Sequence, residues 1–288
     1  MAKFIMLIGI PAAGKDTWAN KYVKENPNTI IHSSDNIREE LYGNQSIQGD
    51  PNKIFEMMRS RAINDLCAGK DIIYNATNVS YRDRKSIIAD VKKLNLKIEL
   101  IAKVFATPIE ECKRRNNLRD RQVPDYVYDK MLKKWKTPCE WEGFDKIEVV
   151  KEETENIVYY LTKMIGFDQK NQHHTLSLFE HSKLTQNYLL KYPNKGKNFW
   201  IIEQAGLYHD IGKLFTQSEP DENGNCHYYG HEGYSSYITL CCGFLESSQL
   251  IAYHMIPYSD GKKTWRERMS KIFWKKLQIL HEADKEAH

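Results

Sequence analysis

The stretch FIMLIGIPAAGKDTW, residues 4–18, decides the fold of the first half of the chain. Apolar residues 4–8 lead into a loop with glycines at positions 9 and 14, and Lys15 follows the second glycine. Residues from Asp16 onward have helical spacing, so the whole stretch predicts a strand, a loop and a helix in that order. Such a loop wraps its backbone around phosphate, and both the helix N-terminus and the lysine attract the anion. An ordinary glycine-containing turn is the alternative, and the strand-to-helix context argues against it. The expected ATP-binding residues are Gly9, Ala12, Ala13, Gly14, Lys15, Asp16 and Thr17.

One position departs from the usual form of this loop. Asp16 stands where Ser or Thr normally ligates Mg²⁺, and the hydroxyl residue Thr17 comes one place later. An aspartate oxygen is also a hard ligand for Mg²⁺. We therefore expect Mg²⁺ to be held at Asp16 and Thr17.

The order of strands and helices predicts two domains. Apolar runs at 4–8, 29–32, 71–74, 97–105 and 146–150 alternate with helix-period segments at 16–25, 51–68 and 81–94. This alternation is typical of an α/β domain with a parallel sheet flanked by helices, predicted over residues 1–150. Beyond it we expect a connecting linker or helix at 151–172 and an all-α domain at 173–288. The expected helices there are 153–165, 175–192, 199–208, 230–245 and 264–287.

Bulk composition narrows the class of protein. The 288 residues are 41% hydrophobic and 28% charged, which excludes a mostly disordered chain. A net charge of +4 permits a nucleic-acid partner without requiring one. The six cysteines form no C-x-x-C pair, and no signal peptide or long apolar span is present, so we expect a cytoplasmic protein with reduced thiols and no membrane partner.

A possible acceptor site follows the second predicted strand. Asp35 and Arg38 are three residues apart and share one face of a helix. The carboxylate can accept a proton from an attacking hydroxyl while the arginine holds a phosphate. Alternatively, Ser34 or Asp35 only caps the helix and Arg38 is solvated.

A basic cluster before Pro124 is a candidate lid. Phosphoryl transfer needs positive charge on the transferred group, and a mobile lid with arginines supplies it while excluding water. The alternative is a solvated basic helix face, which we expect to apply to about half of these residues. The cluster consists of Lys113, Arg114, Arg115, Arg119 and Arg121.

These motifs together resemble the 5′-hydroxyl polynucleotide kinases of bacteriophage type. The resemblance covers residues 1–150 and includes the loop at 9–17, Asp35 to Arg38, Asn75 to Asn78, and Arg115 with the basic lid up to Pro124. It implies that Lys15 and Thr17 hold the ATP phosphates and metal, that Asp35 is the general base and that Arg38 contacts the acceptor strand. It also implies that Arg119 and Arg121 are lid arginines. The family often has an aspartate where Asn75 stands here.

Histidines and aspartates in the second half are spaced for a metal centre. The residues are His181, His209, Asp210, His231, His254 and Asp284, at intervals of 28, 22, 23 and 30 residues with His209 and Asp210 adjacent. About one such residue per helix lets ligands converge inside a bundle. Imidazole with carboxylate suits Zn²⁺, Mn²⁺, Fe, Co²⁺ or Ni²⁺. By default His173, His174, His227, His281 and His288 are taken as ordinary surface or core residues.

The ordered set resembles the HD superfamily of metal-dependent phosphohydrolases. His231 and His254 make it most similar to the branch appended to bacterial CCA-adding enzymes. The resemblance implies a phosphomonoesterase or 2′,3′-cyclic phosphodiesterase, with Asp210 catalytic and Lys213 near the phosphate.

The two resemblances together predict an enzyme that heals broken ends of RNA or DNA. One half would phosphorylate a 5′-hydroxyl and the other would remove a 3′-, 2′- or 2′,3′-cyclic phosphate, after which an RNA ligase can act. One alternative is a nucleoside or small-molecule kinase fused to a nucleotidase. Another is an ATP-gated regulatory module without turnover.

Overall fold

The computed structural model describes residues 1–151, 155–171, 176–193 and 195–287, and these divide into two compact units. The first unit is Met1–Tyr128 with Pro138–Glu152, and the second is Asp129–Thr137 with Glu153–His288. His173, His174 and His288 lie outside the described residues, as do parts of the predicted linker at 151–172.

The first unit contains a five-stranded parallel sheet. The strands are β1 (Ala2–Ile8), β2 (Thr29–Ser33), β3 (Asp71–Asn75), β4 (Ile98–Phe105) and β5 (Lys146–Val150), in the order β2-β3-β1-β4-β5. The central strand β1 pairs with β3 and β4, and residues 4–8 are fully buried or nearly so. This explains why the strand is apolar at every position rather than at alternate ones.

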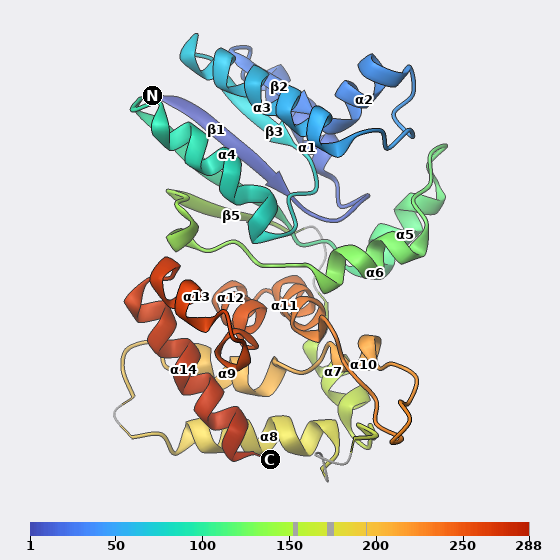
Figure 1. The fold of residues 1–288 in the computed structure, drawn as a ribbon, viewed down its shortest axis with the longest axis vertical. Helices are drawn as coiled ribbons and strands as arrows, with labels where there is room; N and C mark the ends of the chain where they lie inside the picture. Colours follow the sequence, from blue (N-terminus) through green and yellow to red (C-terminus); the bar gives the residue numbers. More distant parts are fainter. Residues whose placement is uncertain (152–154, 172–175, 194, 288) are drawn as a thin grey trace. The chain divides into compact units, whose positions relative to one another are not determined.

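Helices flank the sheet in the first unit (Figure 1). They are α1 (Lys15–Glu25), α2 (Ser34–Tyr42), α3 (Pro51–Cys67) and α4 (Tyr81–Lys93). Two more helices, α5 (Ile109–Asn117) and α6 (Asp125–Lys133), follow β4, and α6 runs into the second unit. A short 3-10 turn, η1 (Glu140–Glu142), precedes β5. The parallel sheet with flanking helices confirms the predicted fold class of this half and fits a P-loop kinase domain.

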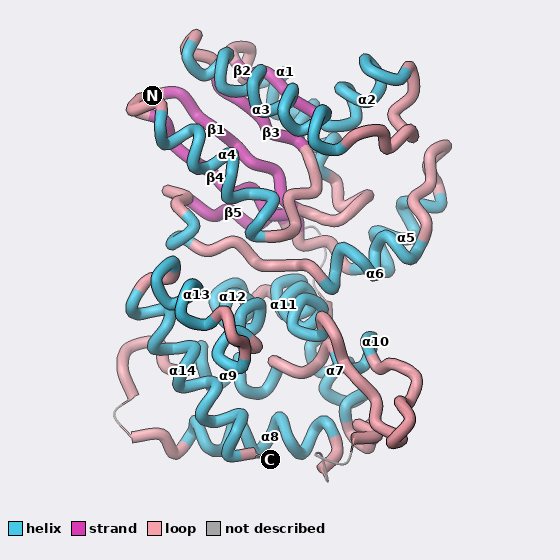
Figure 2. Tube along the Cα trace, in the orientation of Figure 1, coloured by secondary structure: helices cyan, strands magenta, loops and turns pink. Residues whose placement is uncertain are grey.

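In the described part of the second unit the regular elements are helices, and loops join them (Figure 2). Its elements are α7 (Ile157–Met164), α8 (Leu178–Leu190), α9 (Trp200–Tyr208), α10 (Lys213–Thr216), α11 (His231–Cys241), α12 (Leu245–Tyr253), η2 (Ile256–Tyr258), α13 (Lys262–Arg268) and α14 (Lys271–Glu286). Within the described residues, no helix is both long and apolar enough to cross a membrane.

Two helix predictions were wrong in this half. The helix expected over 230–245 ends at Cys241, because Gly243 has a φ of 97° and α12 begins after it. Both α11 and α12 are buried on nearly all sides, so their sequences lack an amphipathic period. The helix expected over 264–287 is two helices, since the Ser270 hydroxyl accepts a hydrogen bond from Phe273 N and starts α14 anew.

Residues 129–137, inside the predicted first domain, pack with the second unit. Trp135 is fully buried, with its ring centroid 4.7 Å from that of Tyr237 in an edge-on arrangement. Its indole nitrogen donates to the Thr137 hydroxyl, which lies 2.7 Å from the Ser236 hydroxyl. The Lys136 ammonium group donates to the carbonyl of Ala252. These contacts fix the segment to α11 and α12.

A buried ion pair anchors η1 in the first unit. The side chains of Arg84 and Glu142 are fully buried, and two guanidinium nitrogens each lie 2.8 Å from a carboxylate oxygen. A third guanidinium nitrogen donates to the Asn78 carbonyl at 3.0 Å. The pair therefore joins α4 and η1 to the loop after β3.

We expect Glu142→Gln to destabilise the first unit by about 3–5 kcal/mol, because it leaves the guanidinium charge buried without its counter-ion. Hydrogen exchange of β1 and β4 amides in increasing denaturant measures this unit separately from the second. Glu140→Gln on the exposed side of the same turn is the matched control. Equal protection in the two variants would contradict the prediction.

Candidate active sites

The loop between β1 and α1 has the geometry of an anion cradle. Ala12 has a φ of 59° and Gly14 a φ of 94°, which turn the backbone sharply before α1. Among the described residues, no side chain caps the N-terminus of α1. Its first N–H groups are therefore free to face phosphate oxygens. The loop is braced by the Thr107 hydroxyl, which donates to the Ala13 carbonyl, and by Gly9 N, which donates to the Thr77 carbonyl.

Lys15 is held at the base of this loop. Its ammonium group donates to the carbonyls of Gly9 at 3.0 Å and Ile10 at 2.8 Å. Burial lowers the pKa of Lys15 to about 8, opposed by the charge of Asp16, while Arg119 lowers it further. A bound anion would restore the favoured charged form, as expected for a phosphate-binding lysine.

Asp16 and Asn75 are hydrogen-bonded partners. The Asn75 amide at the end of β3 donates to Asp16 Oδ1 at 2.7 Å. A neutral amide at position 75 thus accommodates a carboxylate at position 16, whereas two carboxylates at this distance would repel each other. The side chains at these two positions are therefore coupled in this structure. Both residues lie where the loop and the carboxyl end of β3 meet.

The acceptor residues lie at the start of α2. The Ser33 hydroxyl caps the helix by accepting a hydrogen bond from Asp35 N, so neither Ser34 nor Asp35 is the cap that the alternative interpretation expected. Arg38 Nη1 donates to Asp35 Oδ1 at 2.8 Å, and Arg121 Nη1 lies 3.4 Å from the same oxygen. Arg38 Nε is buried and makes no hydrogen bond within the described part of the chain. The Asp35 side chain keeps 44% exposure, so one carboxylate stands between two arginines and open to solvent.

The basic cluster separates into two groups. Arg114 and Arg115 both bind Glu111, whose pKa falls to about 2 as a result of these hydrogen bonds. Lys113 lies 3.5 Å from Asp125, so these three cations belong to a helix face. Arg119 and Arg121 instead lie near Lys15 and Asp35, respectively.

Asn116 shapes the loop that carries these two arginines. Its amide donates to the Val123 carbonyl at 2.9 Å, and Val123 N donates to its oxygen at 2.8 Å. The buried amide thus closes residues 117–122 into a loop. Sequence reasoning did not single out this role, because an asparagine clamp has no spacing signature.

The second unit brings all six predicted metal ligands to one place. His181 lies on α8, His209 and Asp210 follow α9, His231 begins α11, His254 ends α12, and Asp284 lies near the end of α14. All six residues are buried. Five of them line a hollow of about 290 Å³ together with Lys213 and Tyr258, and His209 is the one that does not. Two candidate trios share Asp210: His181 with His209, and His231 with His254.

Asp210 is the centre of the cluster. Its carboxylate oxygens lie 3.6 Å from His181 Nε2, 3.4 Å from His209 Nε2, 3.2 Å from His231 Nε2 and 3.9 Å from His254 Nε2. Asp284 Oδ1 lies 3.0 Å from His181 Nε2 and 3.2 Å from His209 Nε2. Burial alone would raise the pKa of Asp210, but His209 and Lys213 hold it well below its ordinary value.

Every imidazole in the cluster turns its Nδ1 toward a backbone carbonyl. His181 Nδ1 lies 3.4 Å from the Ala287 carbonyl oxygen, and His209 Nδ1 lies 2.9 Å from that of Gly206. His231 Nδ1 lies 2.8 Å from the Tyr228 carbonyl oxygen, and His254 Nδ1 lies 2.8 Å from that of Ile251. If each Nδ1 carries the proton, each Nε2 offers a lone pair to the centre, which is how histidine ligands are oriented.

The donor set fits a transition metal. His231 Nε2 and His254 Nε2 are 3.2 Å apart, an unfavourable contact for two lone pairs that a cation would relieve. His209 Nε2 is buried and makes no hydrogen bond within the described residues. Burial and the neighbouring His231 and His209 lower the pKa of His254 to about 3, which keeps that ring neutral and able to bind metal.

A second layer of residues holds these groups. Tyr258 donates to Asp284 Oδ2 at 2.8 Å. The buried Lys213 ammonium lies 2.8 Å from both Asp210 Oδ2 and Gln169 Oε1. Neither Tyr258 nor Gln169 was predicted, since a single tyrosine or glutamine carries no motif. Of the remaining histidines, His227 lines the same hollow and His281 lies outside the cluster.

Comparison with known proteins matches the first unit. Residues 4–138, less than half of the chain, match the family model AAA_33, described as an AAA domain. The match covers the phosphate loop, Asp35 and the lid loop.

Among solved structures, the chain is similar to one from a Pnkp1/Rnl/Hen1 RNA repair complex, with 23% identity over 45% of this chain and 42% of that chain, at a TM-score of 0.41. A chain from a second structure of a Pnkp1/Rnl/Hen1 complex is 27% identical over 43% of this chain and 41% of that chain, at a TM-score of 0.35. A fungal RNA kinase is 15% identical over 72% of this chain and 49% of that chain, at a TM-score of 0.39. Less than half of each of those chains is covered.

The coupled pair in the phosphate loop gives a first prediction. Asn75→Asp should weaken binding of ATP with Mg²⁺ about tenfold or more, because it sets two carboxylates against each other. Adding Asp16→Ser to that variant should restore binding, since it recreates one hydroxyl and one carboxylate. Calorimetric titration with a non-hydrolysable ATP analogue measures both. Additive losses in the double variant would contradict the coupling.

The second layer of the metal centre gives another prediction. Tyr258→Phe removes the hydrogen bond to Asp284 and should weaken Mn²⁺ or Zn²⁺ binding about 10- to 100-fold. Tyr229→Phe, which alters an exposed tyrosine lining the same hollow, is the control. Competition with a chromogenic chelator measures the metal affinity directly. Unchanged affinity in Tyr258→Phe would remove this tyrosine from the site.

Proposed function

We propose that this protein is a bifunctional enzyme that heals nucleic-acid ends, with RNA as the favoured substrate. The first unit would phosphorylate a 5′-hydroxyl with ATP. The second would remove a 3′-, 2′- or 2′,3′-cyclic phosphate. The observation that carries the proposal is the convergence of four imidazoles on the carboxylate of Asp210, with a second carboxylate, Asp284, against two of them, because a kinase by itself has no use for such a centre.

The kinase step follows from the first site. The backbone of the loop and Lys15 would hold the ATP phosphates. Asp16 and Thr17 would hold Mg²⁺, which supplies charge neutralisation on the β- and γ-phosphates when bound. Asp35 accepts the proton of the 5′-hydroxyl as its oxygen attacks the γ-phosphorus, and ADP leaves. Arg38 binds a phosphate of the acceptor strand, and Arg119 with Arg121 covers the transferred group.

In the free protein, Arg38 and Arg121 both contact Oδ1 of Asp35, and the carboxylate stays open to solvent. An acceptor hydroxyl would therefore give its proton to the other carboxylate oxygen, Oδ2. The transferred phosphoryl group provides an alternative anionic partner for Arg121.

The hydrolytic step uses the second centre. The six ligands, His181, His209, Asp210, His231, His254 and Asp284, would hold one or two metal ions, which supply an activated water and polarise the phosphate when bound. Asp210 belongs to both candidate trios and would be a ligand whichever of them holds the metal. The ammonium group of Lys213 is positioned beside Asp210 and would neutralise a phosphate oxygen.

Both activities suit one broken strand. Adding and removing phosphate on one mononucleotide would be futile. Cleavage that leaves a 5′-hydroxyl and a 2′,3′-cyclic phosphate instead needs a kinase at one end and a phosphohydrolase at the other. A ligase would then join the ends. Because a 2′,3′-cyclic phosphate can form only where a 2′-hydroxyl is present, this pairing of activities favours an RNA substrate.

The two activities should be separable by single substitutions. Asp35→Asn should lower 5′-phosphorylation about 10²- to 10⁴-fold, the contribution of a general base, and leave phosphate release intact. Asp210→Asn should do the reverse. Glu39→Gln, an exposed acid on the same helix as Asp35, is the control. Radiolabel transfer and phosphate release from one oligoribonucleotide measure both. Full kinase activity in Asp35→Asn would refute the assigned base.

A further inference from the structure

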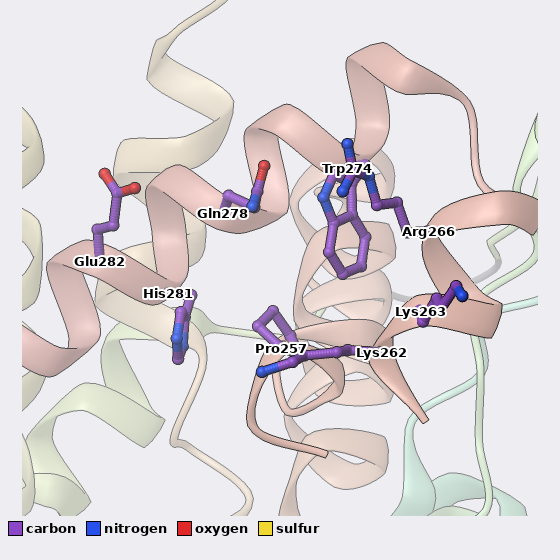
Figure 3. Close-up of a pocket in the computed structure, with 8 residues that line it drawn as sticks. All are labelled: Pro257, Lys262, Lys263, Arg266, Trp274, Gln278, His281 and Glu282. Carbon is purple, nitrogen blue, oxygen red and sulfur yellow. The ribbon is translucent and has the colours of Figure 1, made fainter. Parts of the chain in front are cut away.

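A second hollow of the helical unit lies outside the metal centre. It has a volume of about 340 Å³ and is lined by η2, α13 and α14. Trp274, Gln278, His281 and Glu282 line it from one face of α14, and the residues of α13 lie across from them (Figure 3). None of these residues has a role in the two sites described above.

One wall of this hollow is strongly basic. Lys262, Lys263 and Arg266 are exposed on α13, and among the described residues none of them forms an ion pair. The segment 262–276 contains seven Lys or Arg residues and a single acid, Glu267, in a chain whose net charge is only +4. Glu282 is the one carboxylate that lines the hollow, on the third turn of α14 after Trp274. The hollow therefore suits a polyanion whose charge lies over α13.

Trp274 supplies a flat apolar surface next to these cations. Its side chain is half-buried, and no aromatic ring of the described residues packs against it. An indole with an open face stacks on nucleobases, and base–aromatic stacking tolerates any sequence. Cations and an aromatic ring together form the usual surface for single-stranded nucleic acid, in which phosphates and bases alternate.

The basic hollow shares a wall with the metal centre. His281 lines the basic hollow, and its ring packs edge-on against Tyr258 with centroids 4.2 Å apart. Tyr258 in turn lines the metal-centre hollow and donates to Asp284. His281 Nδ1 is buried without a hydrogen-bond partner in the described structure, which leaves one polar atom of this wall unused.

We propose that this hollow binds the single-stranded segment next to the 3′ end that the metal centre processes. Lys262, Lys263 and Arg266 bind its phosphates, and a base stacks on Trp274. This inference rests on the proposed hydrolytic function and adds that the substrate is a strand rather than a mononucleotide. A strand supplies a phosphate and an aromatic base in each nucleotide, which is what the two walls require. An acidic peptide matches only the cations.

Two variants, each with a matched control, test the site in the full chain. Trp274→Leu removes the stacking surface and Trp274→Phe keeps one. Lys262→Ala with Lys263→Ala removes two charges from the hollow, whereas Lys275→Ala with Lys276→Ala removes two from the same region without touching its lining. The probe is a decaribonucleotide with a 5′-fluorescein and a 3′-phosphate. It is used without divalent metal so that it is not turned over, and thermal unfolding verifies that each variant is folded.

The expected results differ between variant and control. Trp274→Leu should weaken anisotropy-detected binding at least about fivefold, and Trp274→Phe should recover most of it. The Lys262 and Lys263 variant should make the slope of log affinity against log salt shallower by about 1.4, because two single-strand phosphate contacts are lost. The Lys275 and Lys276 control should change this slope less. A 4-thiouridine next to the 3′-terminal nucleotide should cross-link to peptides of α13 and α14.

Binding equal to the control in both variants, or cross-links confined to other peptides, would overturn the site. These readouts do not depend on turnover. If the losses and cross-links occur as expected but no 3′-, 2′- or cyclic phosphate is released with any metal, the hydrolase proposal fails and the strand-binding site stands.

Discussion

The packing of the second unit depends on the contacts of the Asp210 carboxylate. It touches four imidazoles and one ammonium group, and each comes from a different helix or helix end. A buried carboxylate without such partners would cost several kcal/mol, on the order of the penalty for an unpaired buried ion. The helices around it pack so that this charge is satisfied. The same arrangement directs four Nε2 atoms toward the Asp210 carboxylate, so the packing of these helices also assembles the candidate metal site.

The first unit is also organised around buried charged and polar groups, but less completely. Its phosphate loop leaves the start of α1 without a side-chain cap and buries Lys15 against backbone carbonyls. Those groups are stabilised further when an anion arrives. The Asp16–Asn75 hydrogen bond places one carboxylate beside one neutral amide at the end of β3. At this edge of the sheet the carboxylate is therefore held without a second one to repel it.

Much of this architecture could be predicted from the sequence, and the failures have physical reasons. All five strands and the first site's residues follow from local signals: apolar runs, glycine spacing and the lysine. The ligand set was predicted from residue type and interval, because each helix contributes about one ligand. The breaks at Gly243 and Ser270 were missed, since helices buried on all sides lose their period and a serine cap looks like any polar residue. Tyr258, Gln169 and Asn116 act through tertiary contacts, which no spacing encodes. The basic hollow at Trp274 was missed because it joins two helices that looked like one.

The most direct measurement of the central claim follows both ends of one substrate. An oligoribonucleotide with a 5′-hydroxyl and a 2′,3′-cyclic phosphate is incubated with ATP and each of Mg²⁺, Mn²⁺, Co²⁺, Ni²⁺ and Zn²⁺, and both termini are resolved by mass spectrometry. The account predicts a product that gains a 5′-phosphate and has its cyclic phosphate opened or removed under at least one transition metal. Retention of both original ends under every condition would contradict it.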